Sequence, residues 1–207
     1  ATTDIYSYSI EDNSNIVCKG LQEPVAKRTV EGDLGMRVSA GSAFESCREI
    51  CEKLCEDQNI SIKFFSSFVS KVSQLQSYDY IPEPVDEAIC DEILAKAICI
   101  TALERHSGYL EESFSPDGKV FIKHGKNLHA VKHVILTGGF LSYYSKQPLF
   151  KHIIHETKEY SKKNLLLPGD VDYIFDMRNI IPLLGNLTKD HPEIALQLFN
   201  TYILSQK

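Results

Sequence analysis

The sequence lacks the features that mark membrane, secreted and nucleic-acid-binding proteins. No apolar run approaches the ~20 residues of a membrane-spanning helix, and no basic-then-apolar segment of the kind found in secretory signals opens the chain. Lysine and arginine are scattered rather than gathered into a stripe, and the net charge is −6. This distribution argues against nucleic acid or an anionic membrane as a partner. We therefore expect a cytoplasmic protein that binds neither.

Cysteine is too sparse for a disulfide framework, and no Cys-x-x-Cys pair is present. Six cysteines in 207 residues fit free thiols in a reducing compartment better. Cys47, Cys51 and Cys55 recur every four residues, which would place their thiols on one helical face and suits a metal or an iron–sulfur cluster. The alternative, which we favour, is that they pack as small apolar side chains.

Two pairs of histidines have the spacing of metal ligands on one helical face: His129 with His133, and His152 with His155. No acidic or cysteine side chain accompanies them in a known ligand pattern. We therefore expect surface or capping histidines and no bound metal.

Strand and helix patterns alternate along the chain. Alternating apolar and polar residues at 4–10, a turn cluster and the run at 16–19 predict a hairpin. A continuous apolar run predicts a buried parallel strand at 133–137. Short strands are also expected at 171–175 and, after a turn, at 119–123. Helical periodicity predicts helices at about 42–57, 62–74, 86–106, 146–160, 180–187 and 192–204. We expect an α/β fold in which the hairpin at 2–19 and the strands at 27–31, 133–137 and 171–175 form one mixed sheet with helices on both faces.

Glycines occur in two turns that could hold a ligand. Gly32 and Gly35 flank Asp33 just before a helix, where backbone N–H groups can face an anion. An ordinary loop would use the same glycines to permit positive φ, and the residues alone leave both interpretations open. Gly138 and Gly139 follow a buried strand, where ligands approach the backbone in open α/β sheets. Taken alone, a Gly-Gly turn is more often structural.

Three separated motifs resemble those of known proteins. Residues 1–5, Ala-Thr-Thr-Asp-Ile, resemble the tail of the second phosphate-binding hairpin of actin-fold ATPases, and residues 134–140, Val-Ile-Leu-Thr-Gly-Gly-Phe, resemble their adenosine motif. The sharpest match is the series at 27–37, 80–82, 102–108 and 125–128. This series resembles the MutL family associated with glutamate mutase, which is unrelated to the mismatch-repair protein of similar name. The resemblance extends from residue 1 to about residue 204.

The resemblance implies the carboxy-terminal lobe of an actin-like (ribonuclease H-like) ATPase. Residues 1–57 and 133–207 would form this lobe, and residues 58–132 would form an inserted, mostly helical subdomain. A strand that begins almost at residue 1 has no lead-in, which fits a chain cut from a longer protein. The amino-terminal lobe of the same protein would then be the first partner.

The resemblance also implies that ATP and Mg²⁺ are the cofactors. Thr2 and Thr3 would lie near the β- and γ-phosphates, and the turn with Glu31, Gly32, Asp33 and Gly35 would lie beside the nucleotide. The residues implied under the ribose and adenine are Gly138, Gly139 and Phe140. The acidic residues that hold Mg²⁺ would belong to the other lobe, so no metal ligand or catalytic residue is assigned here and no ATP turnover is expected from this piece alone.

The implied function is that of an ATP-dependent chaperone or reactivating factor for an adenosylcobalamin-dependent mutase, whose subunit would be the second partner. Two alternatives stay open. The chain could be a mutase-binding module without a nucleotide role, or half of an actin-fold kinase for a small molecule. The signature at 28–37 disfavours the kinase.

Overall fold

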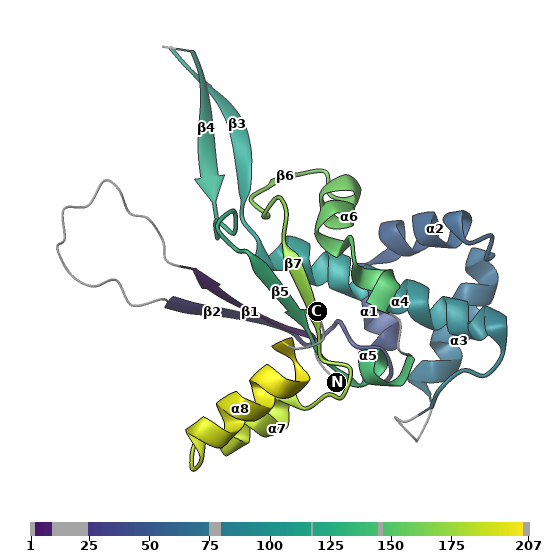
Figure 1. The fold of residues 1–207 in the computed structure, drawn as a ribbon. Helices are drawn as coiled ribbons and strands as arrows, with labels where there is room; N and C mark the ends of the chain where they lie inside the picture. The colour runs from purple at the N-terminus through teal and green to yellow at the C-terminus, as the bar shows by residue number, and fades with distance from the viewer. Residues whose placement is uncertain (1–2, 10–24, 75–79, 117, 145–146, 205–207) are drawn as a thin grey trace. The chain divides into compact units, whose positions relative to one another are not determined.

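The computed structural model describes residues 3–9, 25–74, 80–116, 118–144 and 147–204. The chain forms two compact units (Figure 1). Unit 1 comprises residues 1–130 and 152–169, and unit 2 comprises residues 131–151 and 170–207. Each unit is described below by itself.

Unit 1 is built around the long helix α4 (Val85–His106), as Figure 1 shows. Helices α1 (Ala40–Ser46), α2 (Arg48–Asp57), α3 (Ile62–Ser73) and α6 (Ile153–Tyr160) pack against α4. Because these helices lie on several sides of α4, most of its side chains from residue 90 to residue 102 are buried. The core contains the side chains of Leu34, Phe44, Cys51, Leu54, Phe65, Phe68, Val69, Leu94 and Ile98.

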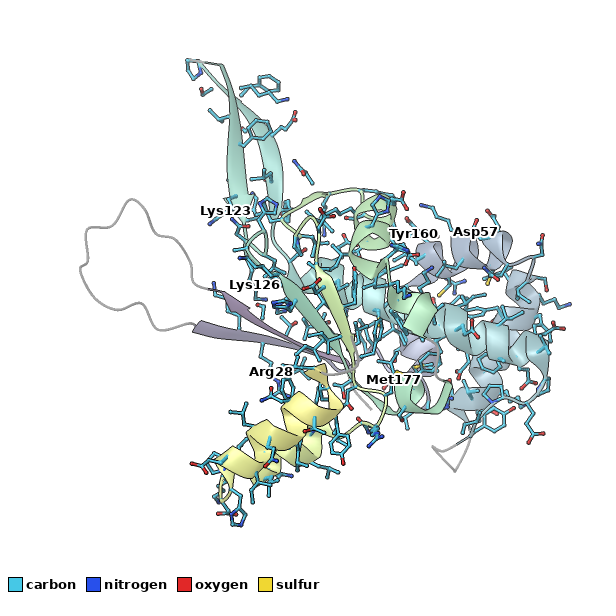
Figure 2. All side chains as sticks on the ribbon, viewed as in Figure 1. Arg28, Asp57, Lys123, Lys126, Tyr160 and Met177 are labelled. Carbon is cyan, nitrogen blue, oxygen red and sulfur yellow. The ribbon has the colours of Figure 1, made fainter. Side chains whose placement is uncertain are left out.

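The helix expected at 42–57 is two helices that meet at Cys47, whose φ of −110° and ψ of 14° interrupt the helical path. Helix α3 begins where Ser61 accepts a 3.2 Å hydrogen bond from the backbone N–H of Phe64, a side-chain cap at its amino terminus. The helices expected at 62–74 and 86–106 are confirmed. At the far end of α2, Tyr160 of α6 donates to Asp57 (3.3 Å; Figure 2).

The described strands of unit 1 form two antiparallel sheets. Strand β1 (Thr3–Ser9) pairs with β2 (Val25–Glu31), and the expected strand at 16–19 lies outside the described residues. Strand β3 (Tyr109–Ser115) pairs along its length with β4 (Gly118–His124) and at its start with β6 (Asn164–Leu165). The expected strand at 119–123 is confirmed as β4.

In the described part of unit 2, two strands form a parallel pair. Strand β5 (His133–Leu136) pairs with β7 (Asp172–Phe175), which confirms both strands to within a residue. The expected burial of the first strand is wrong, because the residues of β5 alternate between exposed and half-buried. Helix α5 (Gly139–Tyr144), a 3₁₀ helix (Gln147–Phe150), α7 (Ile181–Leu187) and α8 (Pro192–Tyr202) complete the unit. The helix expected at 146–160 is therefore divided between the 3₁₀ helix of unit 2 and α6 of unit 1.

The mixed α/β content agrees with the expected class. Among the described residues, the strands pair as β1–β2 and β4–β3–β6 in unit 1 and as β5–β7 in unit 2. The expectation that the first hairpin, β5 and β7 share one mixed sheet would join the two units and stays a prediction. The change of unit near residue 130 lies close to the expected boundary at 132. Residues 40–57, however, pack with α3 and α4. The assignment of 58–132 to an inserted subdomain stays a prediction.

Candidate functional site

The carboxyl ends of β5 and β7 lie at one edge of their parallel pair. Leu136 is opposite Phe175 in the register, so the residues that follow each strand emerge together. Thr137 and Gly138 follow β5, and Asp176 follows β7. The backbone N–H of Asp176 donates to the carbonyl of Leu136 (2.8 Å), which extends the pairing by one residue. This edge is where open α/β sheets bind ligands.

Asp176 organises this edge. Its side chain is fully buried and accepts hydrogen bonds from the Thr137 hydroxyl (2.8 Å) and from the backbone N–H groups of Ile180 (3.0 Å) and Ile181 (2.9 Å). The carboxylate therefore satisfies donors at the start of α7 while it holds the residue that precedes Gly138. Asn179, with a φ of 51°, also accepts from the Thr137 hydroxyl through Oδ1 (3.3 Å).

The two glycines of this turn face open space. Gly138 has a φ of 132°, a backbone conformation that L side chains rarely adopt. A Cβ added at Gly138 or at Gly139 would meet no heavy atom within 4 Å. Phe140 packs edge-on against Phe150, with 6.2 Å between the ring centroids. The turn thus leaves its backbone accessible, while the following aromatic ring is held by local packing.

The expected phosphate-side residues gather at one end of the β1–β2 hairpin. Thr3 is opposite Glu31 in the register, and Gly32 and Asp33 form the turn that follows. Thr2 lies outside the described residues. The hairpin end belongs to unit 1 and the Gly138–Gly139 turn to unit 2. Their expected approach to one nucleotide stays a prediction.

Arg105, at the end of α4, binds both acidic side chains at this end of the hairpin. One of its terminal nitrogens donates to Glu31 (2.6 Å) and to both carboxylate oxygens of Asp33 (2.9 and 3.0 Å). Ser46 donates to Asp33 as well (2.7 Å). The hydrogen bonds from Arg105 and Ser46 lower the pKa of Asp33 to about 2, so the carboxylate stays ionised.

His106 is buried against the middle of the same hairpin. Its ring nitrogens contact the hydroxyls of Thr29 (2.8 Å) and Ser7 (2.9 Å), one from each strand. Lys126 donates to the backbone carbonyl of His106 (3.1 Å; Figure 2). Burial, assisted by the charge of Lys126, lowers the pKa of His106 to about 4, so the ring is neutral near pH 7.

Arg37, the last residue of the 27–37 signature, holds a buried acid of α4. Arg37 makes a bidentate contact with Asp91 (2.7 and 2.9 Å) and donates to the carbonyls of Met36 and Tyr80. Asp91 is fully buried in α4. Asp91 had no predicted role, although an acid inside an apolar helical stretch signals a buried partner. Arg105 and His106 belong to the 102–108 motif and had no predicted role either.

The three cysteines spaced four residues apart are buried rather than arranged as ligands. Cys47, Cys51 and Cys55 belong to the core, and burial raises the pKa of Cys47 and Cys55 to about 11. The expectation that they pack as apolar side chains is thus confirmed. Within the described ranges, no group of three or more His, Cys, Asp or Glu side chains is placed to hold a metal ion. In the same ranges, no helix is both long and apolar enough to cross a membrane.

Fold and site together define a mixed α/β protein with an open glycine turn at the carboxyl edge of a parallel strand pair. The chain belongs to the MutL protein family, whose model matches residues 1–203. It is 34% identical over 208 residues to "Protein MutL" of Clostridium tetanomorphum. That alignment covers 99% of this chain and 43% of the relative, so the chain spans less than half of the relative's length. No solved structure matches the chain. The family expected from the motif series is confirmed.

Proposed function

We propose that this chain is the carboxy-terminal, nucleotide-binding lobe of an ATP-dependent reactivating factor for an adenosylcobalamin-dependent mutase of the glutamate mutase type. The other lobe would come from the rest of a longer protein, and the whole would have an actin-like fold and act in the cytoplasm. Nucleotide binding between two lobes would close the cleft, and this change of shape would open the mutase for exchange of a damaged cobalamin.

The observation that carries the proposal is the open turn at Gly138 and Gly139. A nucleoside needs a surface on which its ribose and base can approach the backbone without meeting a Cβ. Both glycines leave that space free, and the buried carboxylate of Asp176 fixes the residue before them. This arrangement supports adenosine binding at residues 138–140, with Phe140 at its border.

The end of the β1–β2 hairpin in unit 1 gives weaker support for a phosphate site. Its acids Glu31 and Asp33 are both engaged by Arg105. We therefore assign to Thr3, Gly32 and Asp33 the positioning of the turn beside the phosphates, and not the coordination of Mg²⁺. The Mg²⁺ ligands would be acids of the other lobe, together with water and the phosphates themselves.

The test is a calorimetric titration of the complete protein with ATP and Mg²⁺. Gly139→Val places a branched side chain in the space assigned to the nucleoside, and the φ of Gly139 does not require glycine. We expect a loss of affinity of about tenfold or more, the equivalent of 1.4 kcal/mol. The matched control is Gly169→Val, since a Cβ at Gly169 also meets nothing within 4 Å but lies outside the turn.

Thermal unfolding of each variant separates a lost site from a lost fold. Unchanged ATP affinity in Gly139→Val would remove the glycine turn from the nucleotide site. If the complete protein binds no ATP but still binds the mutase subunit, the alternative of a binding module without a nucleotide role is correct. Transfer of the γ-phosphate to a small molecule would instead identify the kinase alternative.

A further inference from the structure

The β3–β4 hairpin exposes large apolar side chains on both of its faces. Phe114 is 82% exposed and Phe121 is 54% exposed, and Val120 and Ile122 are 41% and 45% exposed. Figure 1 shows the hairpin extending away from the helices of unit 1. Isolated exposed apolar residues are ordinary, but a contiguous group along one ribbon marks an interaction surface.

The register assigns these side chains to two faces. Residues directly opposite one another share a face, so Phe121, opposite Glu112, lies on the same face as Phe114, opposite Lys119. Val120, opposite Ser113, and Ile122, opposite Glu111, share the other face. Lys119 donates to Glu112 (2.7 Å) and lies 5.2 Å from the ring centroid of Phe121, so the aromatic face also carries charge.

Strand β4 also presents an edge for pairing. Among the described strands, β4 pairs only with β3, whereas the outer edge of β3 is partly covered by β6 at Tyr109 and Leu110. The sequence of β4 is Gly-Lys-Val-Phe-Ile-Lys-His, in which lysines flank an apolar centre and no acid occurs. Lys123 lies on this strand (Figure 2). Such an edge can accept a further strand through its backbone groups.

Lys119 and Lys123 determine which kind of segment can pair with the edge of β4. A second copy of β4, paired antiparallel about Phe121, would bring Lys119 of one copy opposite Lys123 of the other, and like charges directly opposite are destabilising. A segment with carboxylates at those two positions and apolar residues between them would instead form opposite-charge pairs. Membrane insertion is disfavoured because Glu111 and Glu112 of β3 lie on opposite faces of the hairpin, so either face would take an acid into the bilayer.

We propose that β4 is a docking edge for a protein partner that adds an extended segment in which acidic residues flank an apolar centre. Backbone pairing along residues 118–124 provides the attachment, Phe121 packs on one face of the added strand, and Lys119 and Lys123 select its charge. This surface is independent of the proposed nucleotide site.

The test uses the complete protein and a fluorescein-labelled synthetic peptide. The peptide has glutamates flanking a Val-Tyr-Val centre, spaced as Lys119 and Lys123 are, and fluorescence anisotropy measures its binding. A second peptide carries lysines in place of the glutamates. We expect saturable binding of the glutamate peptide and at least about tenfold weaker binding of the lysine peptide.

Two variants and a control assign the binding to the hairpin. Phe121→Ser should weaken binding of the glutamate peptide by about tenfold or more. The double variant Lys119→Glu with Lys123→Glu should exchange the preference and bind the lysine peptide, which a misfolded hairpin could not do. Phe64→Ser, which removes a 41% exposed phenylalanine from α3, should leave binding unchanged.

Three outcomes would overturn the proposal. The first is no binding of the glutamate peptide, or equal binding by wild type and Phe121→Ser. The second is sedimentation of the protein with phosphatidylserine vesicles that depends on Phe121, which would make the hairpin a membrane anchor. The third is self-association in analytical ultracentrifugation that Phe121→Ser abolishes, which would make the occupant a second copy.

Discussion

The hydroxyl of Thr137 donates a 2.8 Å hydrogen bond to the buried carboxylate of Asp176, and this bond joins the ends of two parallel strands. The same carboxylate accepts from the backbone at the start of α7. Because Thr137 directly precedes Gly138, the contact also fixes the beginning of the proposed nucleoside turn. The stability of unit 2 and the shape of that turn therefore depend on one side chain.

Asp176→Asn should destabilise the fold. The substitution replaces one acceptor oxygen with an NH₂ group that faces N–H and O–H donors, and buried donors left without an acceptor cost about 1–3 kcal/mol. Urea unfolding measures the change. Asp170→Asn, at an exposed position, is the matched control and should stay within about 0.5 kcal/mol of wild type. Equal changes in the free energy of unfolding for the two substitutions would mean that the buried carboxylate of Asp176 does not stabilise the fold.

Gly138→Ala and Gly139→Ala should differ although both methyl groups enter open space. At Gly138 the φ of 132° strains any L residue, at a cost of about 1–3 kcal/mol. Gly139 begins α5, where alanine has the higher helix propensity, so its substitution should be neutral or slightly stabilising. Melting temperatures of the two variants compare them directly. A Gly138→Ala variant as stable as Gly139→Ala would contradict the strain argument.

Removal of either partner of the Arg37–Asp91 pair should be severe. Arg37→Met leaves the fully buried Asp91 carboxylate without its cation, and breaking a buried ion pair in this way costs about 3–5 kcal/mol. Replacing both residues, with Asp91→Leu added, should cost much less than the sum of the two single changes. Chemical denaturation of the four proteins forms a double-mutant cycle. Additive losses would show that the two side chains do not act as a pair.

His106 should make stability depend on pH in a defined window. Its pKa falls from 6.5 to about 4 on folding, so between these values the unfolded chain binds more protons. Stability should then rise as pH increases from 4 to 6.5 and should be lost as pH falls through that range, by at most about 3 kcal/mol. The pKa of Asp33 is lowered to about 2, so its contribution is lost only at lower pH.

The measurement is the free energy of unfolding at a series of pH values. His106→Gln can still contact the two hydroxyls and should flatten the slope between pH 4 and 6.5. His155→Gln is the control, because the side chain of His155 is 73% exposed and its ring is not part of the core. A slope that survives His106→Gln would place the titrating group elsewhere.

The elements of this protein were largely predictable from local pattern. Apolar periodicity located α3 and α4 to within a residue at either end, and the continuous run before Gly138 located β5. The motif series also predicted the family. Strand β3 was missed because its side chains are mostly exposed or half-buried on both faces, so no periodic apolar signal marks it.

Local pattern could not predict the pairing of residues distant in the chain. The sequence by itself determined where most helices and strands lie, because a segment's hydrophobic period depends on its own residues. Only the tertiary structure decided that Asp91 meets Arg37, that Asp176 meets Thr137, and that the strand at 3–9 pairs with residues 25–31. The physical reason is that the two partners are far apart in the chain and meet only when the intervening residues fold. The local pattern around a polar residue is the same whichever partner it contacts in the folded protein.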